Sequence, residues 1–168
     1  MGREKTYEID LVSLREGQSN EYSYHIGKEF FTDRGADIVI DADVAVHLDI
    51  TARRGMYLLQ FDFVGRLDVP CDRCLQPVAV DVDTEYDLTV RHGEELDDSS
   101  DEVLVIPESW SRLDVAPMIY DTLLLSIPLR CVHAEGGCDS EMAAALRDHR
   151  AGDDADDDQD EDQEADKE

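Results

Sequence analysis

Four cysteines are the residues of this chain best able to do chemistry, and they fall into two groups. Cys71 and Cys74 form a C-x-x-C motif, while Cys131 and Cys138 lie far downstream with His133 between them. Two thiols on a tight turn can bind a metal ion, form a disulfide or exchange redox equivalents. The N-terminus does not resemble an export signal, so we expect a cytoplasmic location, where cysteines serve as thiols or metal ligands.

A zinc ion needs four nitrogen or sulfur ligands that converge on one point. Cys71 and Cys74 have the spacing of one ligand pair, and Cys138 can supply the second pair with either Cys131 or His133. The spacing His133-x4-Cys138 is nearer to common ligand spacings, and two intervening glycines let the loop fold back. We therefore expect zinc as the cofactor, bound by Cys71, Cys74, His133 and Cys138.

Two other interpretations of the cysteines stay open. A free cysteine packs as a small apolar residue, and Cys71 shares the parity of Val69, which is predicted to be buried. The pair could also be catalytic, with Arg73 stabilising a thiolate, although a thioredoxin-like C-x-x-C opens a helix and this one joins two predicted strands. No phosphate-binding glycine loop, nucleophile elbow or H-E-x-x-H motif is present. We expect no enzyme activity; the alternative is a zinc- or thiol-dependent enzyme that uses Cys71 and Cys74.

The C-x-x-C motif lies between segments that alternate between apolar and polar residues, as half-buried strands do. These segments are 38–50, 57–69 and 78–90. Their apolar residues occupy even, odd and even positions in turn, and acidic residues occupy much of the opposite face. The pattern predicts an antiparallel meander with an apolar and an acidic face, whose second bend carries the cysteine pair.

Weaker signals surround this meander. Short alternating runs predict strands over 7–11, 22–26 and 103–106. Asp114 can cap a helix that ends near Leu125, with its apolar residues along one stripe.

A second helix is predicted over 140–149, because this stretch is rich in Ala, Leu and Met. The fold class is thus α+β: an antiparallel β-meander, with a small open barrel as a variant, followed by one or two C-terminal helices. We expect one domain over 1–150 and a disordered acidic tail over 151–168.

Acidic residues dominate the composition, with 42 Asp and Glu against 15 Lys and Arg and a formal net charge of −27. The stretch from Gly152 to Glu168 contributes −10, which leaves −17 for the rest of the chain. Such a protein repels nucleic-acid phosphates and attracts basic proteins. We therefore expect a basic protein partner, and an acidic chaperone-like binding protein is a further alternative. No apolar run approaches the length of a membrane span, so we expect no membrane partner.

Two blocks of the sequence resemble the YceD family, the large ribosomal RNA subunit accumulation proteins. The first block is V-P-C-D-R-C-L-Q-P at 69–77, followed by an alternating acidic strand. The second block comprises Leu113-Asp114-Val115, then Tyr120, Leu124-Leu125, Ile127-Pro128 and the stretch from His133 to Cys138. The ending, which looks like the version found in Bacteroidetes-type bacteria, is Cys138-Asp139-Ser140-Glu141-Met142, then Leu146 and His149.

The resemblance implies a bacterial cytoplasmic factor in ribosome biogenesis that supports accumulation of large-subunit ribosomal RNA, without an established enzyme activity. Some family members carry a further C-x-x-C near the C-terminus; here His133 and Cys138 would have to complete the site. Because the chain is acidic, we expect a ribosomal protein or an rRNA-processing factor as partner, with indirect contact to ribosomal RNA. The motif residues expected to take part in partner binding are Asp72, Arg73, Leu75 and Pro77.

Overall fold

The structure is a computed structural model that describes residues 6–134 and 137–138. Strands predominate in this part of the chain. The predicted helix over 140–149 and the acidic tail over 151–168 lie outside the described residues. In chain order the elements are β1 (Glu8–Asp10), a short 3-10 turn (Leu11–Ser13), β2 (Ser19–Gly27), α1 (Lys28–Thr32), β3 (Asp41–Arg53), β4 (Met56–Pro70), β5 (Pro77–Gly93), β6 (Val103–Pro107), β7 (Arg112–Asp114) and α2 (Ala116–Leu125).

The main sheet has five strands in the order β2-β3-β4-β5-β6. The first four pair antiparallel with their sequence neighbours, which confirms the predicted meander. β6 differs, because it pairs parallel to β5. After β5 the chain first runs back along the outer edge of β6, where Asp97 bridges to Val105, and then turns again. The strand order is linear, so the sheet is open, and among the described residues β2 and β6 are its two edges.

The predicted alternation sets which face of the sheet is buried. Even positions of β3, odd positions of β4 and even positions of β5 point into the core. The opposite positions are largely exposed. The fully buried side chains of these strands include Val44, Val46, Leu48, Ile50, Leu59, Phe61, Phe63, Leu67 and Val90.

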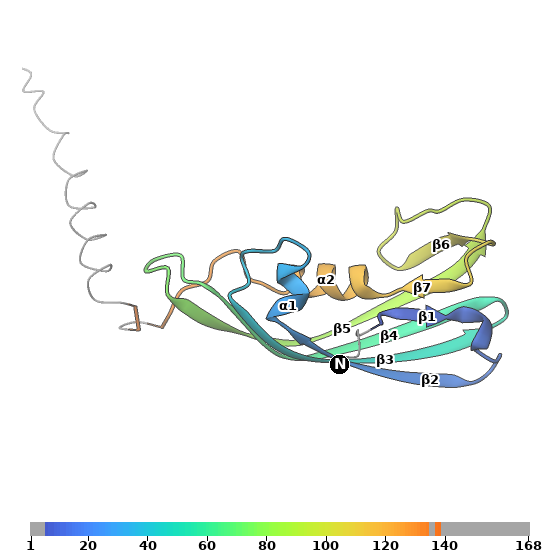
Figure 1. Ribbon diagram of the computed structural model, residues 1–168, viewed down its shortest axis with the longest axis horizontal. Coiled ribbons are helices and arrows are strands. Elements are labelled where there is room, and N and C mark those ends of the chain that lie inside the picture. The colour runs from blue at the N-terminus through green and yellow to red at the C-terminus, as the bar shows by residue number, and fades with distance from the viewer. Residues whose placement is uncertain (1–5, 135–136, 139–168) are drawn as a thin grey trace, which may run out of the picture.

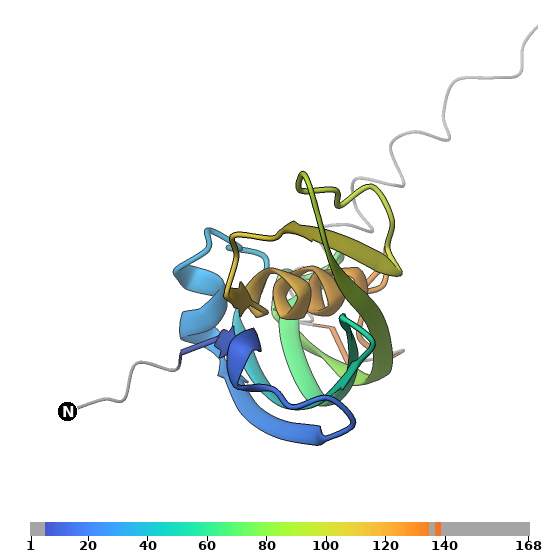
Figure 2. The same ribbon diagram turned by 90° about the vertical axis from the view of Figure 1, so that its right-hand side faces the viewer.

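A second layer covers the apolar face of the sheet (Figures 1 and 2). It consists of α1, α2 and the small β1–β7 sheet, in which Glu8 pairs with Asp114. From α2, Ile119 and Leu123 are buried against the sheet. The helix begins two residues after Asp114, so the N-cap position falls on Val115 rather than on the predicted cap, while Asp114 Oδ1 accepts a hydrogen bond from the Ala116 N–H at 2.9 Å.

The uncovered face of the sheet is acidic, as predicted. Its exposed residues include Asp43, Asp62, Asp81, Asp83 and Asp87. The strand register sets carboxylates directly opposite one another, an arrangement that destabilises a sheet. Such pairs are Asp41 with Asp68, Asp62 with Glu85, and Glu21 with Asp49. None of the helices in the described part of the chain is long and apolar enough to cross a membrane.

Candidate metal centre

The hairpin between β4 and β5 positions the first two cysteines. The strands end at the paired residues Pro70 and Pro77. Within the loop, the Leu75 N–H donates to the Cys71 carbonyl at 3.0 Å. Leu75 has a φ of 62°, a left-handed conformation that turns the chain back directly after Cys74. Both cysteines are buried, so the loop holds two thiols on its inner side at a fixed separation.

A pair of hydrogen bonds brings the C-terminal segment onto this loop. The Asp72 N–H donates to the Cys131 carbonyl at 2.7 Å, and the Cys131 N–H donates to Asp72 Oδ2 at 2.7 Å. Once Cys131 is held there, the residues that follow it reach the cysteine pair. His133 and Cys138 thus meet Cys71 and Cys74 despite their distance in the sequence.

The four side chains have the spacing of a tetrahedral metal site. Their ligand atoms all lie within 4.8 Å of one another. Cys71 Sγ is 3.8 Å from Cys138 Sγ, and Cys74 Sγ is 3.4 Å from His133 Nδ1. With ordinary zinc–sulfur and zinc–nitrogen bond lengths, a tetrahedron has edges of about 3.8 Å between two sulfurs and about 3.6 Å between sulfur and nitrogen. The cluster therefore fits a zinc ion, and the sulfurs are too far apart to be a disulfide.

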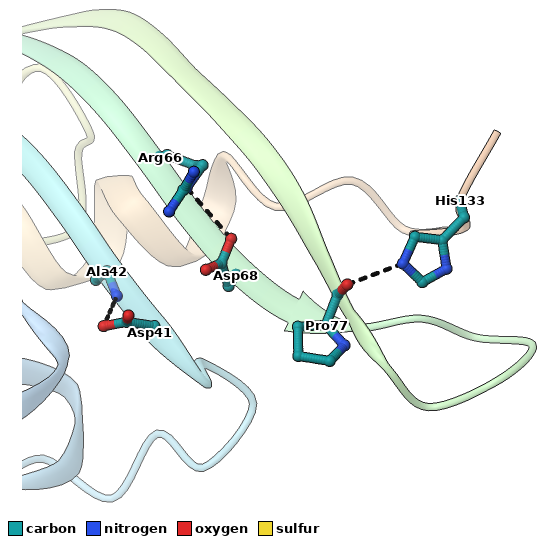
Figure 3. Close-up of polar contacts among 6 residues, drawn as sticks. All are labelled: Asp41, Ala42, Arg66, Asp68, Pro77 and His133. Carbon is teal, nitrogen blue, oxygen red and sulfur yellow. Dashed lines mark hydrogen bonds and ion pairs between the residues drawn. The ribbon is translucent and has the colours of Figure 1, made fainter. Parts of the chain in front are cut away.

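A second contact orients the imidazole of His133. Its Nε2 lies 2.8 Å from the carbonyl oxygen of Pro77, at the start of β5 (Figure 3). Because the carbonyl can only accept, Nε2 carries the proton and donates. The lone pair of Nδ1 then faces the thiol of Cys74. Metal-binding histidines are commonly held in this way by a backbone carbonyl, which fixes the tautomer of the ligand.

The surroundings shift the pKa values of the cluster. Burial raises the pKa of the Cys71 thiol, but the N–H groups of Cys74, Arg73 and His133 and the Cys74 side chain outweigh it and lower that pKa to about 6. The Pro77 carbonyl raises the pKa of His133 against the effect of burial, with help from Cys74 and Cys71. Burial, followed by the neighbouring thiols, raises the pKa of Cys138. One sulfur is thus poised as a thiolate, the form that binds metal.

The motif residues predicted to bind a partner divide into two groups. Asp72 and Pro77 make the contacts that build the cluster. The Arg73 N–H donates to Cys71 Sγ at 3.4 Å while its side chain is exposed, and Leu75 is 64% exposed. Partner binding by these residues stays a prediction.

Cys131, the alternative ligand, lies outside the cluster. It is buried, and its thiol donates to the Pro128 carbonyl at 3.5 Å. Burial, Asp72 and Cys71 raise the pKa of its thiol. Among the described residues, Cys131 therefore serves the site through its backbone rather than through its sulfur.

A second group of side chains, whose ligand atoms lie close enough together to share a metal ion, was not predicted from the sequence: Glu21, His47 and Asp49 on β2 and β3. The pairing of Glu21 with Asp49 across the two strands creates it, and a linear pattern does not reveal such a contact. His47 also lies 3.3 Å from the Ser23 hydroxyl. The group is at least partly open to solvent, and we assign it no role.

These observations define the class of protein: an acidic α+β protein whose β-hairpin tip and C-terminal segment form a cluster of three cysteines and one histidine. A family model described as large ribosomal RNA subunit accumulation protein YceD matches residues 59–167, or 109 of the 168 residues. The chain therefore belongs to the YceD family, whose description implies a role in the accumulation of large-subunit ribosomal RNA. No curated protein and no solved structure matches the chain.

Proposed function

We propose that this protein is a non-enzymatic factor in bacterial ribosome biogenesis. It acts in the cytoplasm and supports the accumulation of large-subunit ribosomal RNA by binding a basic protein. Membership of the YceD family supports the cellular process in this proposal, the accumulation of large-subunit ribosomal RNA. The observation that carries the mechanism is the acidic face of the sheet, where carboxylates stand opposite one another, as Asp62 does to Glu85. A partner rich in Lys and Arg would relieve this repulsion, while RNA phosphates would increase it. Contact with ribosomal RNA is therefore indirect in this proposal.

The cluster of Cys71, Cys74, His133 and Cys138 is proposed to hold a structural zinc ion. The sulfur and nitrogen distances support it, as does the carbonyl of Pro77 behind His133. When bound, the ion would supply a cross-link between the β4–β5 hairpin and the C-terminal segment. Four protein ligands would leave no coordination position of a tetrahedral zinc ion open, as is typical of structural rather than catalytic zinc.

Two binding measurements test whether the partner is a basic protein or ribosomal RNA. Filter binding with ribosomal RNA fragments at physiological salt is expected to show little retention of RNA by the isolated protein. In a pull-down with proteins extracted from purified large subunits, basic proteins are expected to bind. Tight RNA binding that weakens steeply with salt would contradict the protein-partner mechanism. In a strain deleted for the gene, the expected defect is a lower ratio of large- to small-subunit ribosomal RNA.

The alternative, an enzyme that uses Cys71 and Cys74, is favoured by one observation, the lowered pKa of Cys71. Replacement of both cysteines by Ser separates the two functions. For a structural site, we expect zinc content to fall from about one ion per chain to none and the melting temperature to drop by several degrees. Cys131→Ala is the matched control and should keep its zinc. Unchanged folding and zinc content with a lost activity would favour catalysis.

A further inference from the structure

A groove lies between α2 and the part of the sheet that contains β5 and β6. Its volume is about 870 Å³. Figure 2 shows α2 within the hollow of the curved sheet. The floor of the groove is apolar, with half-buried side chains from Tyr86, Leu104, Met118 and Leu124. Leu125, at the end of α2, is 84% exposed at its edge.

Carboxylates surround this apolar floor. Glu85, Asp98, Asp101 and Asp121 line the groove, all four are exposed, and no Lys, Arg or His is among the lining residues. Within the described residues, none of the four carboxylates forms an ion pair. Burial, then Asp101 and Asp121, raise the pKa of Tyr86, so the negative field extends to the floor. The groove thus combines exposed apolar surface with negative charge that no Lys, Arg or His of the described residues pairs with.

This combination restricts what can bind. The apolar floor favours bulky apolar side chains, and the carboxylates favour Lys and Arg beside them. Three other occupants are repelled by charge: an RNA backbone, a second copy of this chain with its net −27, and the chain's own stretch from Gly152 to Glu168 with its net −10.

We propose that the groove binds a short cationic segment of a protein partner, which inserts one or two bulky apolar side chains between α2 and β5. Lys or Arg residues of the segment then lie against Asp98, Asp101 and Asp121. This inference rests on the proposed function and adds to it a second contact with the basic partner, in the groove, beside the attraction exerted by the acidic face of the sheet.

Two groove variants and one control test the proposal. Asp98→Lys/Asp101→Lys/Asp121→Lys reverses the charge of the rim, and Leu125→Ser removes the exposed apolar edge. The hydrogen bond from the Tyr86 hydroxyl survives the first variant, because its acceptor is the backbone carbonyl of Asp101 at 2.7 Å. The matched control makes the same change in net charge in α1 and the loop after it, on exposed residues outside both the groove and the uncovered face of the sheet: Glu29→Lys/Asp33→Lys/Asp37→Lys.

The probe is a fluorescent synthetic peptide of about 12 residues, with two Leu among Lys and Arg, compared with the same peptide carrying Ser at both Leu positions. Binding to the full-length protein is measured by fluorescence anisotropy, and thermal melts verify that each variant is folded. We expect the Leu peptide to bind about tenfold more tightly than the Ser peptide. Both groove variants should weaken its binding about tenfold or more, and the control by no more than about threefold.

Several outcomes would overturn the proposal. Equal weakening by the control variant would mean diffuse charge attraction, and equal binding of the two peptides would mean that the apolar floor is not used. If the native protein retains ribosomal RNA and the groove variants do not, the groove binds a nucleic acid instead of a protein segment.

A pull-down with large-subunit proteins separates this inference from the proposed function. If the native protein binds no basic protein of the large subunit, the proposed function fails. If the native protein and the groove variants bind such proteins equally, only the groove assignment fails.

Discussion

Asp72 is exposed, yet it connects two parts of the chain that are far apart in the sequence. Its carboxylate and its N–H both bond to the backbone of Cys131. Without the carboxylate, the Cys131 N–H loses its acceptor, and the segment that carries His133 and Cys138 is less firmly held. The residue is thus a positioning residue of the cluster rather than a ligand.

Asp72→Ala is therefore expected to weaken zinc binding about 10- to 100-fold, although all four ligands remain. Asp72→Asn keeps an oxygen acceptor for the Cys131 N–H and should retain most of the affinity. The measurement is zinc competition against a chromogenic chelator at constant pH. Equal affinity in the native protein and Asp72→Ala would show that the hydrogen bond does not position the ligands.

The four residues of the cluster could be predicted from the sequence because cysteine is rare and ligand spacing is regular. The choice of His133 over Cys131 could also be made from spacing. The roles of Asp72 and of the Pro77 carbonyl could not, since they depend on how a distant segment crosses the hairpin tip. The sequence motif marked these two residues as notable but assigned them to partner binding.

At the scale of elements, the backbone of β3 lies close to the position that a Cβ atom of Gly65 on β4 would take. A Cβ atom there would lie 2.6 Å from the Cα of Val44 and nearer still to the Asp43 carbonyl oxygen. Both neighbours are backbone atoms of the paired strand, so they cannot move aside alone. Glycine at this position lets the two central strands keep their pairing where the sheet bends.

Gly65→Ala is expected to destabilise the fold by about 1–3 kcal/mol and to lower the melting temperature by roughly 3–10 °C. Val64→Ala is the matched control, because Val64 is exposed on the other face of the same strand. Differential scanning calorimetry of the three proteins measures the effect. A melting temperature of Gly65→Ala equal to that of the control would refute the close approach of the strands.

Tyr24 on β2 provides a pH test of the packing between the two layers. Its ring stacks on that of Tyr7 at 5.1 Å between centroids. Burial, with smaller contributions from Tyr22, Tyr7 and Asp114, raises its pKa from 10.0 to about 12. Because the neutral form is favoured in the folded state, this contribution to stability is complete below pH 10 and is lost as the pH rises towards 12.

The native protein should therefore lose stability between about pH 10 and pH 12, and Tyr24→Phe should lose less, as measured by urea unfolding. An alkaline titration of tyrosinate absorbance should show a late step that Tyr24→Phe lacks. Identical titrations of the two proteins would mean that the Tyr24 hydroxyl is not buried.

The long strands could be predicted from the sequence, because an alternation sustained over many residues has no helical counterpart. The short elements could not. α1 has five residues and β7 has three, too few for a periodic signal, and both form because the core offers a place for Phe31 and Leu113. The parallel direction of β6 was also missed, since it depends on how the loop after β5 doubles back.

For the whole molecule, negative charge opposes folding. Screening by salt reduces repulsion among exposed carboxylates, so about 0.5 M NaCl should raise the melting temperature above its value in dilute buffer.

Asp62→Lys should add roughly 0.2–1 kcal/mol of stability, because Glu85 lies directly opposite on β5. Asp83→Lys is the control, since its partner in the register is the uncharged Val64. Equal gains from both variants would indicate a general effect of net charge.

The pairing of β1 with β7 also bears on the order in which the chain folds. Strands β2 to β5 pair with their neighbours in the sequence, so this part can form early. β1 can pair only later, because Glu8 pairs with Asp114 of β7, and the chain between β1 and β7 forms the five-stranded sheet. During synthesis from the N-terminus, the first strand made is therefore among the last to find its place. A nascent chain that stops before Asp114 should leave β1 open to proteolysis.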